Sequence, residues 1–224
     1  MPGKPTWRLE REAWRSGYRR VAGLDEAGRG CLAGPVVAAA AVLDPSWKLV
    51  GVDDSKRLGR RKRERLYEQI LRGAWSWSVA LVCPQEIDRT DILSATLHAM
   101  GEATRLLPRP ADFLLVDALE LRGCGVPYRP VIGGDRLSVS IAAASIIAKV
   151  TRDTYMEEAD SRFPGYGFAL HKGYGTRAHL AALRAMGITP LHRRSFSGVG
   201  THQHRLPFRE TDEAARPEPP RALE

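Results

Sequence analysis

Four acidic side chains follow apolar stretches of the sequence, and together they could bind a metal ion. Asp25 and Glu26 end an apolar segment that begins at Val21, and Asp117 ends the run FLLVD. Asp135 follows two glycines and comes shortly before a long segment of helical character. Burying an isolated carboxylate costs several kcal/mol unless it is paired or bound to a cation. Because Mg²⁺ and Mn²⁺ prefer carboxylate oxygens, the four acids predict a divalent-cation site.

Each acid taken alone has a second interpretation. An Asp at the end of a strand often supports a turn or caps a helix, which is as good an explanation for any single one of them. Neighbours such as Asp25 and Glu26 also point to opposite sides of a strand, unless the strand ends there and the chain turns. The glycine-rich segment that follows them, residues 28–30, favours the metal site.

That segment, Gly28-Arg29-Gly30, is called the GRG loop below. Gly28 and Gly30 have no Cβ, so their backbone amides and carbonyls can approach a ligand closely. Arg29 offers a guanidinium fork for a phosphate. Alone, this sequence is more simply a tight turn between strands, but beside two acids it favours a binding role.

Apolar runs and helical periodicity place these residues in an α/β fold. We expect strands over residues 21–25, 36–43, 75–82, 113–116 and 130–132. We expect helices over 60–71, 91–107, 141–158 and 176–186, with Ser140 as the N-cap of the third. Strands followed by alternating helices and strands predict a layered α/β domain with a mixed sheet and a small C-terminal helical appendage.

Composition and charge limit the class of protein. The 224 residues are 43% hydrophobic and 27% charged, which is typical of one globular domain. Lys and Arg number 34 against 26 Asp and Glu, and this net charge of +8 favours a polyanionic partner. We expect residues 1–19 to form a basic arm, 20–200 the folded domain, and the Pro-rich 201–224 a disordered tail.

Cysteine usage and hydropathy predict the compartment. Cys31, Cys83 and Cys124 lie far apart, which argues against a disulfide framework or a thiolate zinc site and favours a reducing compartment. The charged N-terminus has no apolar secretory segment, and the longest apolar run, 36–43, is far below the ~18 residues of a membrane span. We therefore expect a cytoplasmic monomer with no membrane partner.

The segment VAGLDEAGRGCLAGPVVAAAAVL, residues 21–43, strongly resembles the signature of the ribonuclease HII family. The resemblance continues in DDSKRL, IDRTDILSATLHAM, LLVDAL and GDRLSVSIAAASIIAKVTRD, and it ends in HKGYGT and HRRSF. It covers about residues 20–200, in order. It implies a ribonuclease H-like catalytic domain, with a mixed five-stranded sheet flanked by helices.

The resemblance also implies roles for individual residues. The four acids would bind two divalent cations, Mn²⁺ or Mg²⁺, and the GRG loop would contact the ribonucleotide 2′-hydroxyl and its flanking phosphate. Tyr174 would support the sugar beside the RNA–DNA junction. Lys56 and Lys172 are either phosphate contacts or solvated charges, and His171 either assists proton transfer or is structural.

Three positions depart from the family pattern. Cys31 stands where Pro is common, Asp91 where Asn is usual, and Gly133 where Lys often precedes the Gly-Asp pair. By this resemblance, the last departure would remove one phosphate contact. None of the three changes the four acids.

The implied activity is that of an endonuclease for RNA–DNA hybrids and for ribonucleotide-containing duplex DNA. It would hydrolyse the RNA strand of hybrids and cut on the 5′ side of single ribonucleotides, leaving 3′-hydroxyl and 5′-phosphate ends. One alternative is ribonuclease HIII, which shares the fold and the hybrid substrate but carries an added N-terminal domain, whereas about twenty residues precede the motif here. The other alternative is a hybrid-binding protein without activity, which would gain nothing from four acids facing phosphate. A replication or repair partner could bind through the tail.

Overall fold

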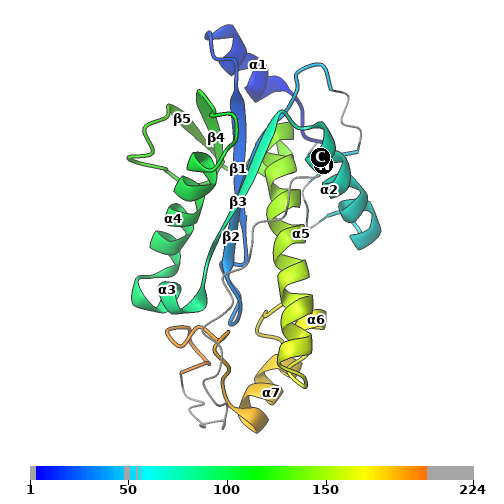
Figure 1. Ribbon diagram of the computed structural model, residues 1–224, viewed down its shortest axis with the longest axis vertical. Helices are drawn as coiled ribbons and strands as arrows, with labels where there is room; N and C mark the ends of the chain where they lie inside the picture. The colour runs from blue at the N-terminus through cyan, green and yellow to red at the C-terminus, as the bar shows by residue number, and fades with distance from the viewer. Residues whose placement is uncertain (1–3, 48–50, 54, 56, 201–224) are drawn as a thin grey trace.

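A mixed five-stranded sheet forms the centre of the molecule (Figure 1). The computed structural model describes residues 4–47, 51–53, 55 and 57–200. The strands are β1 (Val21–Ala27), β2 (Val36–Val42), β3 (Ser76–Val82), β4 (Phe113–Asp117) and β5 (Tyr128–Val131). Their order is β3-β2-β1-β4-β5; β1, β2 and β3 are successively antiparallel, whereas β1, β4 and β5 are parallel. The central position of β1 places the DEAGRG sequence in the middle of one sheet edge.

Helices cover both faces of the sheet. They are α1 (Arg8–Arg15), α2 (Arg60–Gly73), α3 (Pro84–Arg89), α4 (Ile92–Arg105), the 3₁₀ helix η1 (Gly134–Arg136), α5 (Val139–Arg162), α6 (Phe168–His171) and α7 (Arg177–Met186). Figure 1 shows α3 and α4 on one face, α2 and α5 on the other, and α6 and α7 beyond one end of the sheet. The predicted mixed five-stranded sheet flanked by helices is therefore confirmed.

The core lies in two layers, one on each side of β2. Every residue of β2 is buried, which explains its uninterrupted apolar sequence. Ala38 packs on the side of α4, in a cluster that includes Met100. Ala39 packs on the opposite side, in a cluster that includes Ala143 of α5. The direction of any β1 side chain therefore follows from its cross-strand partner on β2.

Helix α5 approaches β1 closely because small residues line the contact. A Cβ built on Gly23 would lie 2.1 Å from the carbonyl carbon of Ser140, so only glycine fits there. Ala142, Ala143 and Ala144 are all fully buried at the start of the helix. This close packing holds the first turns of α5 against the strand that carries Asp25.

The start of α5 differs from the sequence prediction. Ser138, not Ser140, is the N-cap, since its side chain accepts a hydrogen bond from the Ile141 backbone N–H at 3.1 Å. Ser140 already lies inside the helix, which begins at Val139, and its backbone N–H donates to the Glu10 carboxylate at 2.9 Å. The prediction of Ser140 as the cap was wrong for this tertiary reason.

Several other element boundaries also differ from the predictions. Strand β1 does not end at Asp25, because its pairing with β2 extends to Ala27 opposite Val37. Asp91 lies just before α4 as its N-cap and accepts from the backbone N–H groups of residues 93 and 94. An Asp caps a helix as well as the Asn that is usual in the family, so this departure leaves the local structure intact.

The N-terminal residues pack on the same domain. Leu9 and Ala13 of α1 are buried in one cluster with Leu115 of β4 and Ile141 of α5. The proposed boundary between residues 19 and 20 stays a prediction, and the tail over 201–224 lies outside the described residues. Within the described part of the chain, no helix combines the length and apolar character needed to cross a membrane.

Candidate active site

Asp25 and Asp117 lie side by side on neighbouring parallel strands. The last register pair between β1 and β4 joins Leu24 to Val116, and each aspartate is the next residue along its strand. Alternation along β4 puts Asp117 on the same face as Leu115, which packs against α5. Both carboxylates therefore belong to the α5 face of the sheet, at one edge.

The Asp25 carboxyl lies among other acids in a buried position. Asp25 is only 6% exposed, and this burial raises its pKa well above the ordinary value. The charges of Glu26 and Asp117 raise the pKa further, whereas hydrogen bonds from the Ser145 hydroxyl and the Glu26 backbone N–H lower it. The ionised acids repel one another, and a bound cation would relieve that repulsion.

Asp135 is held close to the end of β4 by the backbone before it. The Gly134 N–H donates to Asp117 Oδ1 at 2.6 Å, which ties η1 to the strand end. Asp135 follows directly, is buried, and has its Oδ1 3.8 Å from the Arg136 Nε. The structure thus brings the third predicted acid to the same edge of the sheet as Asp117.

Glu26 is placed differently from its neighbour because β1 continues past it. Cross-strand pairing sets Glu26 beside Ala38, on the α4 side, and Asp25 beside Ala39, on the α5 side. Among the residues that the structure describes, no three acidic, His or Cys side chains are arranged to enclose a metal ion. Asp25, Asp117 and Asp135 form an open group at one sheet edge, whereas Glu26 belongs to the other face of β1. Mg²⁺ is commonly held by one or two carboxylates together with water and substrate phosphates.

The two glycines of the GRG loop serve different purposes. Gly28 has a φ of +97°, and a Cβ there would lie 2.0 Å from the Arg152 Nε, so the protein itself requires glycine. Gly30 has no such constraint among the described residues, since apart from its two chain neighbours none of their atoms would lie within 4 Å of a Cβ built there. Arg29 is partly exposed, with its Nη1 3.4 Å from Glu26 Oε1. The loop is therefore open to a ligand on the side of Gly30 and Arg29.

A buried arginine that the sequence analysis did not assign holds this loop in place. Arg193 is 0% exposed and donates from Nη1 to the Arg29 carbonyl at 2.9 Å. Its Nε and Nη2 donate to the Gly34 carbonyl at 3.0 and 2.8 Å. Burial and the nearby charge of Arg152 lower the pKa of Arg193 to about 10, so it remains charged at neutral pH. The only signal in the sequence was its place in HRRSF.

Arg152 joins the segment that follows the GRG loop to the segment 171–174, called the HKGY loop below. Its guanidinium donates to the Ala33 carbonyl at 2.9 Å and to the Lys172 carbonyl at 2.8 Å. Tyr174, at the end of the HKGY loop, is 44% exposed. The structure therefore brings the HKGY loop, with the predicted sugar-supporting tyrosine, against residues 32–33, because the backbone N–H groups of Leu32 and Ala33 donate to the Gly173 carbonyl. These residues directly follow Cys31, the residue after the GRG loop.

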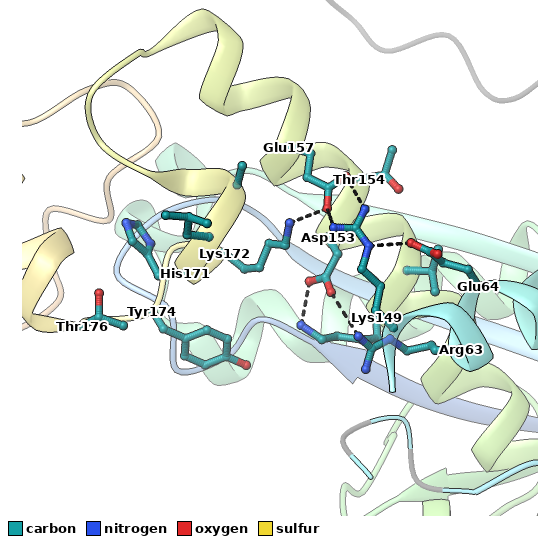
Figure 2. A pocket seen from close by; sticks show the side chains of 14 residues that line it. Arg63, Glu64, Lys149, Asp153, Thr154, Glu157, His171, Lys172, Tyr174 and Thr176 are labelled. Carbon is teal, nitrogen blue, oxygen red and sulfur yellow. Dashed lines mark hydrogen bonds and ion pairs between the residues drawn. The ribbon is translucent and has the colours of Figure 1, made fainter. Parts of the chain in front are cut away.

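A cavity of about 710 Å³ opens beside Tyr174, between α2, α5 and the HKGY loop (Figure 2). Its wall carries alternating charges. Lys149 pairs with Asp153 at 2.6 Å, and the Lys149 Nζ lies 6.0 Å from the centre of the Tyr174 ring. The ring of Tyr174 thus borders a charged cavity that polar ligands can enter.

The remaining predicted residues are less suited to substrate contact. The Lys172 ammonium pairs with Glu157 at 2.6 Å, and its side chain is only 13% exposed. Both ring nitrogens of His171 bind backbone atoms, the Tyr166 carbonyl at 2.7 Å and the Gly173 N–H at 3.2 Å, which agrees with the structural alternative. Lys56 lies outside the described residues.

A sequence model of the family described as ribonuclease HII matches residues 22–199. The chain belongs to the ribonuclease HII family. A ribonuclease HII of Desulfitobacterium hafniense strain Y51 is 53% identical over 192 residues, covering 86% of this chain and 74% of that protein. The ribonuclease HII of Syntrophotalea carbinolica is 52% identical, covering 85% of this chain and 91% of that protein.

Solved structures agree with the ribonuclease HII assignment. The crystal structure of ribonuclease H2 from Pyrococcus horikoshii OT3 matches with a TM-score of 0.70 at 27% identity, covering 82% of this chain and 96% of that one. An Archaeoglobus fulgidus ribonuclease HII, solved in complex with PCNA, matches with a TM-score of 0.69 at 28% identity, covering 80% and 95%. Family membership makes the chain a ribonuclease H endonuclease that acts on RNA–DNA hybrids.

Sequence analysis also missed a buried glutamate behind this ribonuclease HII site. Glu10 of α1 is 0% exposed, and its Oε1 accepts from the Ser138 hydroxyl at 2.5 Å and the Ser140 N–H at 2.9 Å. Its carboxylate therefore sits at the positive end of α5 and satisfies an N–H that the helix cannot. Glu10 secures the start of α5, three residues after Asp135.

We expect Glu10→Gln to lower the free energy of unfolding by about 1–3 kcal/mol, because the neutral amide weakens two charge-assisted hydrogen bonds in a buried place. Urea unfolding monitored by circular dichroism measures this loss. Glu12→Gln on the same helix is the control, since Glu12 makes only exposed ion pairs with Arg8 and Arg129. Equal unfolding midpoints for the two variants would contradict the role of Glu10.

Proposed function

We propose that this ribonuclease HII incises duplex DNA on the 5′ side of single ribonucleotides, in addition to cutting the RNA strand of hybrids. The products would carry 3′-hydroxyl and 5′-phosphate ends. One observation carries the proposal: Asp25 and Asp117 lie side by side at one sheet edge, where DEAGRG continues from Asp25 into the GRG loop. That arrangement puts candidate metal ligands next to a loop suited to recognising a ribose.

We further propose that two divalent cations, Mn²⁺ or Mg²⁺, bind at the four acids. Asp25 and Asp117 would be the central ligands, and Glu26 and Asp135 would complete the two sites. Burial and the neighbouring charges of Glu26 and Asp117 raise the pKa of Asp25, and the repulsion among these acids supports the assignment, as does their hard oxygen chemistry. A pair of bound cations supplies an attacking water of lowered pKa and a stabilised leaving 3′-oxygen.

The GRG loop is proposed to recognise the ribonucleotide. RNA differs from DNA by the 2′-hydroxyl, which both donates and accepts hydrogen bonds, and exposed backbone groups of the loop can do both in return. Arg29 can contact the adjacent phosphate, because its guanidinium is partly exposed and only loosely paired with Glu26. The open space at Gly30 supports this role, since no contact within the described part of the chain requires a glycine there.

We expect Gly30→Ala to leave the urea midpoint unchanged and to raise the KM for an RNA–DNA hybrid about tenfold, because a Cβ displaces the substrate and not the protein. Steady-state cleavage and urea unfolding measure the two effects. Gly101→Ala is the matched control, since a Cβ at Gly101 of α4 also meets no atom within 4 Å. A KM equal to that of the control would exclude a sugar contact at Gly30.

Tyr174 is proposed to contact the deoxyribose on the far side of the junction. Tyr174 is 44% exposed, and its neighbour Gly173 is hydrogen-bonded to Leu32 and Ala33, close after the GRG loop in the sequence. An aromatic face packs well on a sugar that lacks a 2′-hydroxyl. A 2′-hydroxyl at that position would be disfavoured. Tyr174 would thereby favour a single ribonucleotide in DNA over a continuous RNA strand.

The experiment that tests the function uses duplex DNA with one ribonucleotide, beside an all-DNA duplex and an RNA–DNA hybrid. We expect one cut, 5′ of the ribonucleotide, with Mn²⁺ or Mg²⁺, and none with EDTA or in the all-DNA duplex. Asp117→Asn should abolish cutting while the affinity for the hybrid survives or improves, which separates an enzyme from a binding protein. Undiminished cutting by Asp117→Asn would disprove the assignment of Asp117 as a metal ligand.

We also propose a cytoplasmic location and a replication or repair partner that binds residues 201–224. The free thiols of Cys31, Cys83 and Cys124 support a reducing compartment. Removing residues 201–224 and measuring binding to a sliding clamp tests the partner, and unchanged binding would exclude the tail as its site.

A further inference from the structure

Two histidines connect the backbone of Tyr174 to a distant part of the chain. The ring Nδ1 of His179 lies 2.9 Å from the Tyr174 carbonyl oxygen, and its Nε2 lies 3.0 Å from the Nε2 of His192. The Nδ1 of His192 accepts from the Thr189 backbone N–H at 2.8 Å. These contacts form an unbroken chain from Thr189 to Tyr174, called the histidine relay below.

The backbone groups at its two ends fix the protons of the histidine relay. An N–H can only donate, so Nδ1 of His192 accepts from Thr189 and the proton of His192 lies on Nε2. That proton is donated to Nε2 of His179, whose own proton must then lie on Nδ1. From Nδ1 it is donated to the Tyr174 carbonyl, which can only accept. One arrangement of protons satisfies every contact, and in it both rings are neutral.

The surroundings of the relay favour the neutral state. His179 and His192 are buried, and burial lowers the pKa of both, that of His192 to about 3. The ring of His171 stacks on His179 at a centroid distance of 4.3 Å, and the edge of Phe168 meets it at 5.6 Å. Because the rings are packed on several sides, the relay has little freedom to rearrange.

The relay begins in the same short segment that holds the GRG loop. His192 is hydrogen-bonded to His179, which is in turn hydrogen-bonded to the Tyr174 carbonyl. The next residue, Arg193, donates a hydrogen bond to the Arg29 carbonyl. The two elements proposed to read the sugars on either side of the junction are therefore anchored to adjacent residues. Their relative position depends on this shared anchor.

We propose that His179 and His192 are positioning residues that fix the position of the Tyr174 backbone relative to the GRG loop. They would thereby set the preference of the enzyme for single ribonucleotides over a continuous RNA strand. The inference rests on the proposed function, in which Tyr174 contacts the deoxyribose. Figure 2 shows the Tyr174 side chain at the edge of the cavity, extending away from His171 and toward Lys149. A shift of its backbone would move the ring along the substrate, and small displacements of positioning groups are costly.

The test compares kcat/KM for a duplex with one ribonucleotide against kcat/KM for an all-RNA strand paired with DNA. We expect Tyr174→Ala, His179→Phe and His192→Phe each to lower this ratio about tenfold, because each removes or displaces the ring. His179→Asn should retain part of the ratio, since its amide N–H can still donate to the Tyr174 carbonyl. His98→Phe, an exposed histidine on α4, is the control and should leave the ratio at the parental value.

The outcomes separate the two claims. If Tyr174→Ala lowers the ratio and the two histidine-to-phenylalanine variants do not, the relay is overturned and the proposed function stands. If Tyr174→Ala leaves the ratio unchanged, the sugar-reading role of Tyr174 and the relay are both overturned, although hybrid cleavage at the four acids is unaffected. If all three variants lower it, the relay is supported.

A measurement on the parent protein keeps the proposal testable even if a variant does not fold. Imidazole ¹⁵N chemical shifts distinguish the two neutral tautomers from each other and from the charged ring. At neutral pH we expect protonation at Nδ1 of His179 and at Nε2 of His192. The opposite tautomer at either ring, or a charged ring, would overturn the relay.

Discussion

Asp25→Asn is expected to abolish cleavage and yet to make the metal-free protein more stable. The parental carboxylate is buried beside Glu26 and Asp117, and both burial and those charges raise its pKa. An amide carries no charge and can still accept the hydrogen bonds from Ser145 and the Glu26 N–H. We expect a gain of about 1–3 kcal/mol in the free energy of unfolding. Cleavage should fall more than about a hundredfold, because even partners that only orient a metal ligand cost 10–100-fold.

The gain in stability depends on pH in a direction set by the raised pKa of Asp25. Only the ionised carboxylate is penalised in the folded state, so below the ordinary carboxyl pKa the variant and the parent should be equally stable. As the pH rises toward neutrality, the unfolded state loses its proton first and the parent loses stability relative to the variant. The difference should therefore be largest near pH 7 in EDTA.

Urea unfolding in EDTA at several pH values measures this difference, with Glu158→Gln on the exposed side of α5 as the control. Added Mn²⁺ provides a second readout, because a cation that binds only the folded state stabilises the parent and should stabilise Asp25→Asn less. A variant that is less stable than the parent at pH 7 would contradict the repulsion. Equal stabilisation of both by Mn²⁺ would contradict the role of Asp25 as a ligand.

The sequence predicts best the strands that have a continuous apolar run and the site residues that lie in a family motif. The apolar run over 36–43 predicts a strand, but which of Asp25 and Glu26 shares a face with Asp117 follows only from the pairing of β1 with β2 and β4. The family motifs supply the candidate acids and the GRG loop. The length of β1 could not be predicted from the sequence pattern. Its last residues are extended because they pair with β2, and not because of their own β propensity.

Contacts between distant segments were beyond sequence reasoning. Ser140 fits the pattern of an N-cap, but Ser138 is the N-cap of α5, and the buried Glu10 near the N-terminus accepts hydrogen bonds from both serines. Arg193 looks like one more basic residue in a basic protein, although it is fully buried. Each role depends on which backbone groups the fold brings within hydrogen-bond distance. The pattern of residues in one segment does not predict which distant segment will contact it.

Arg193→Met is expected to be among the most damaging substitutions in this chain. It removes the donors that satisfy the carbonyls of Arg29 and Gly34, and methionine offers none in their place. Each buried carbonyl left without a partner costs about 1–3 kcal/mol, so the free energy of unfolding should fall by about 3–5 kcal/mol. Because the GRG loop loses its anchor at Arg29, kcat/KM for the hybrid should fall about a hundredfold or more.

Arg193→Lys separates the charge of Arg193 from its geometry. A lysine keeps the positive charge, but a single ammonium cannot reproduce the planar fork that reaches Arg29 and Gly34 at once. We therefore expect an intermediate loss of stability and a loss of cleavage close to that of Arg193→Met. The exposed neighbour Arg194 gives the control, and Arg194→Met should retain parental stability. If Arg193→Lys cleaves the hybrid like the parent, charge alone is sufficient and the anchoring of the loop is disproved.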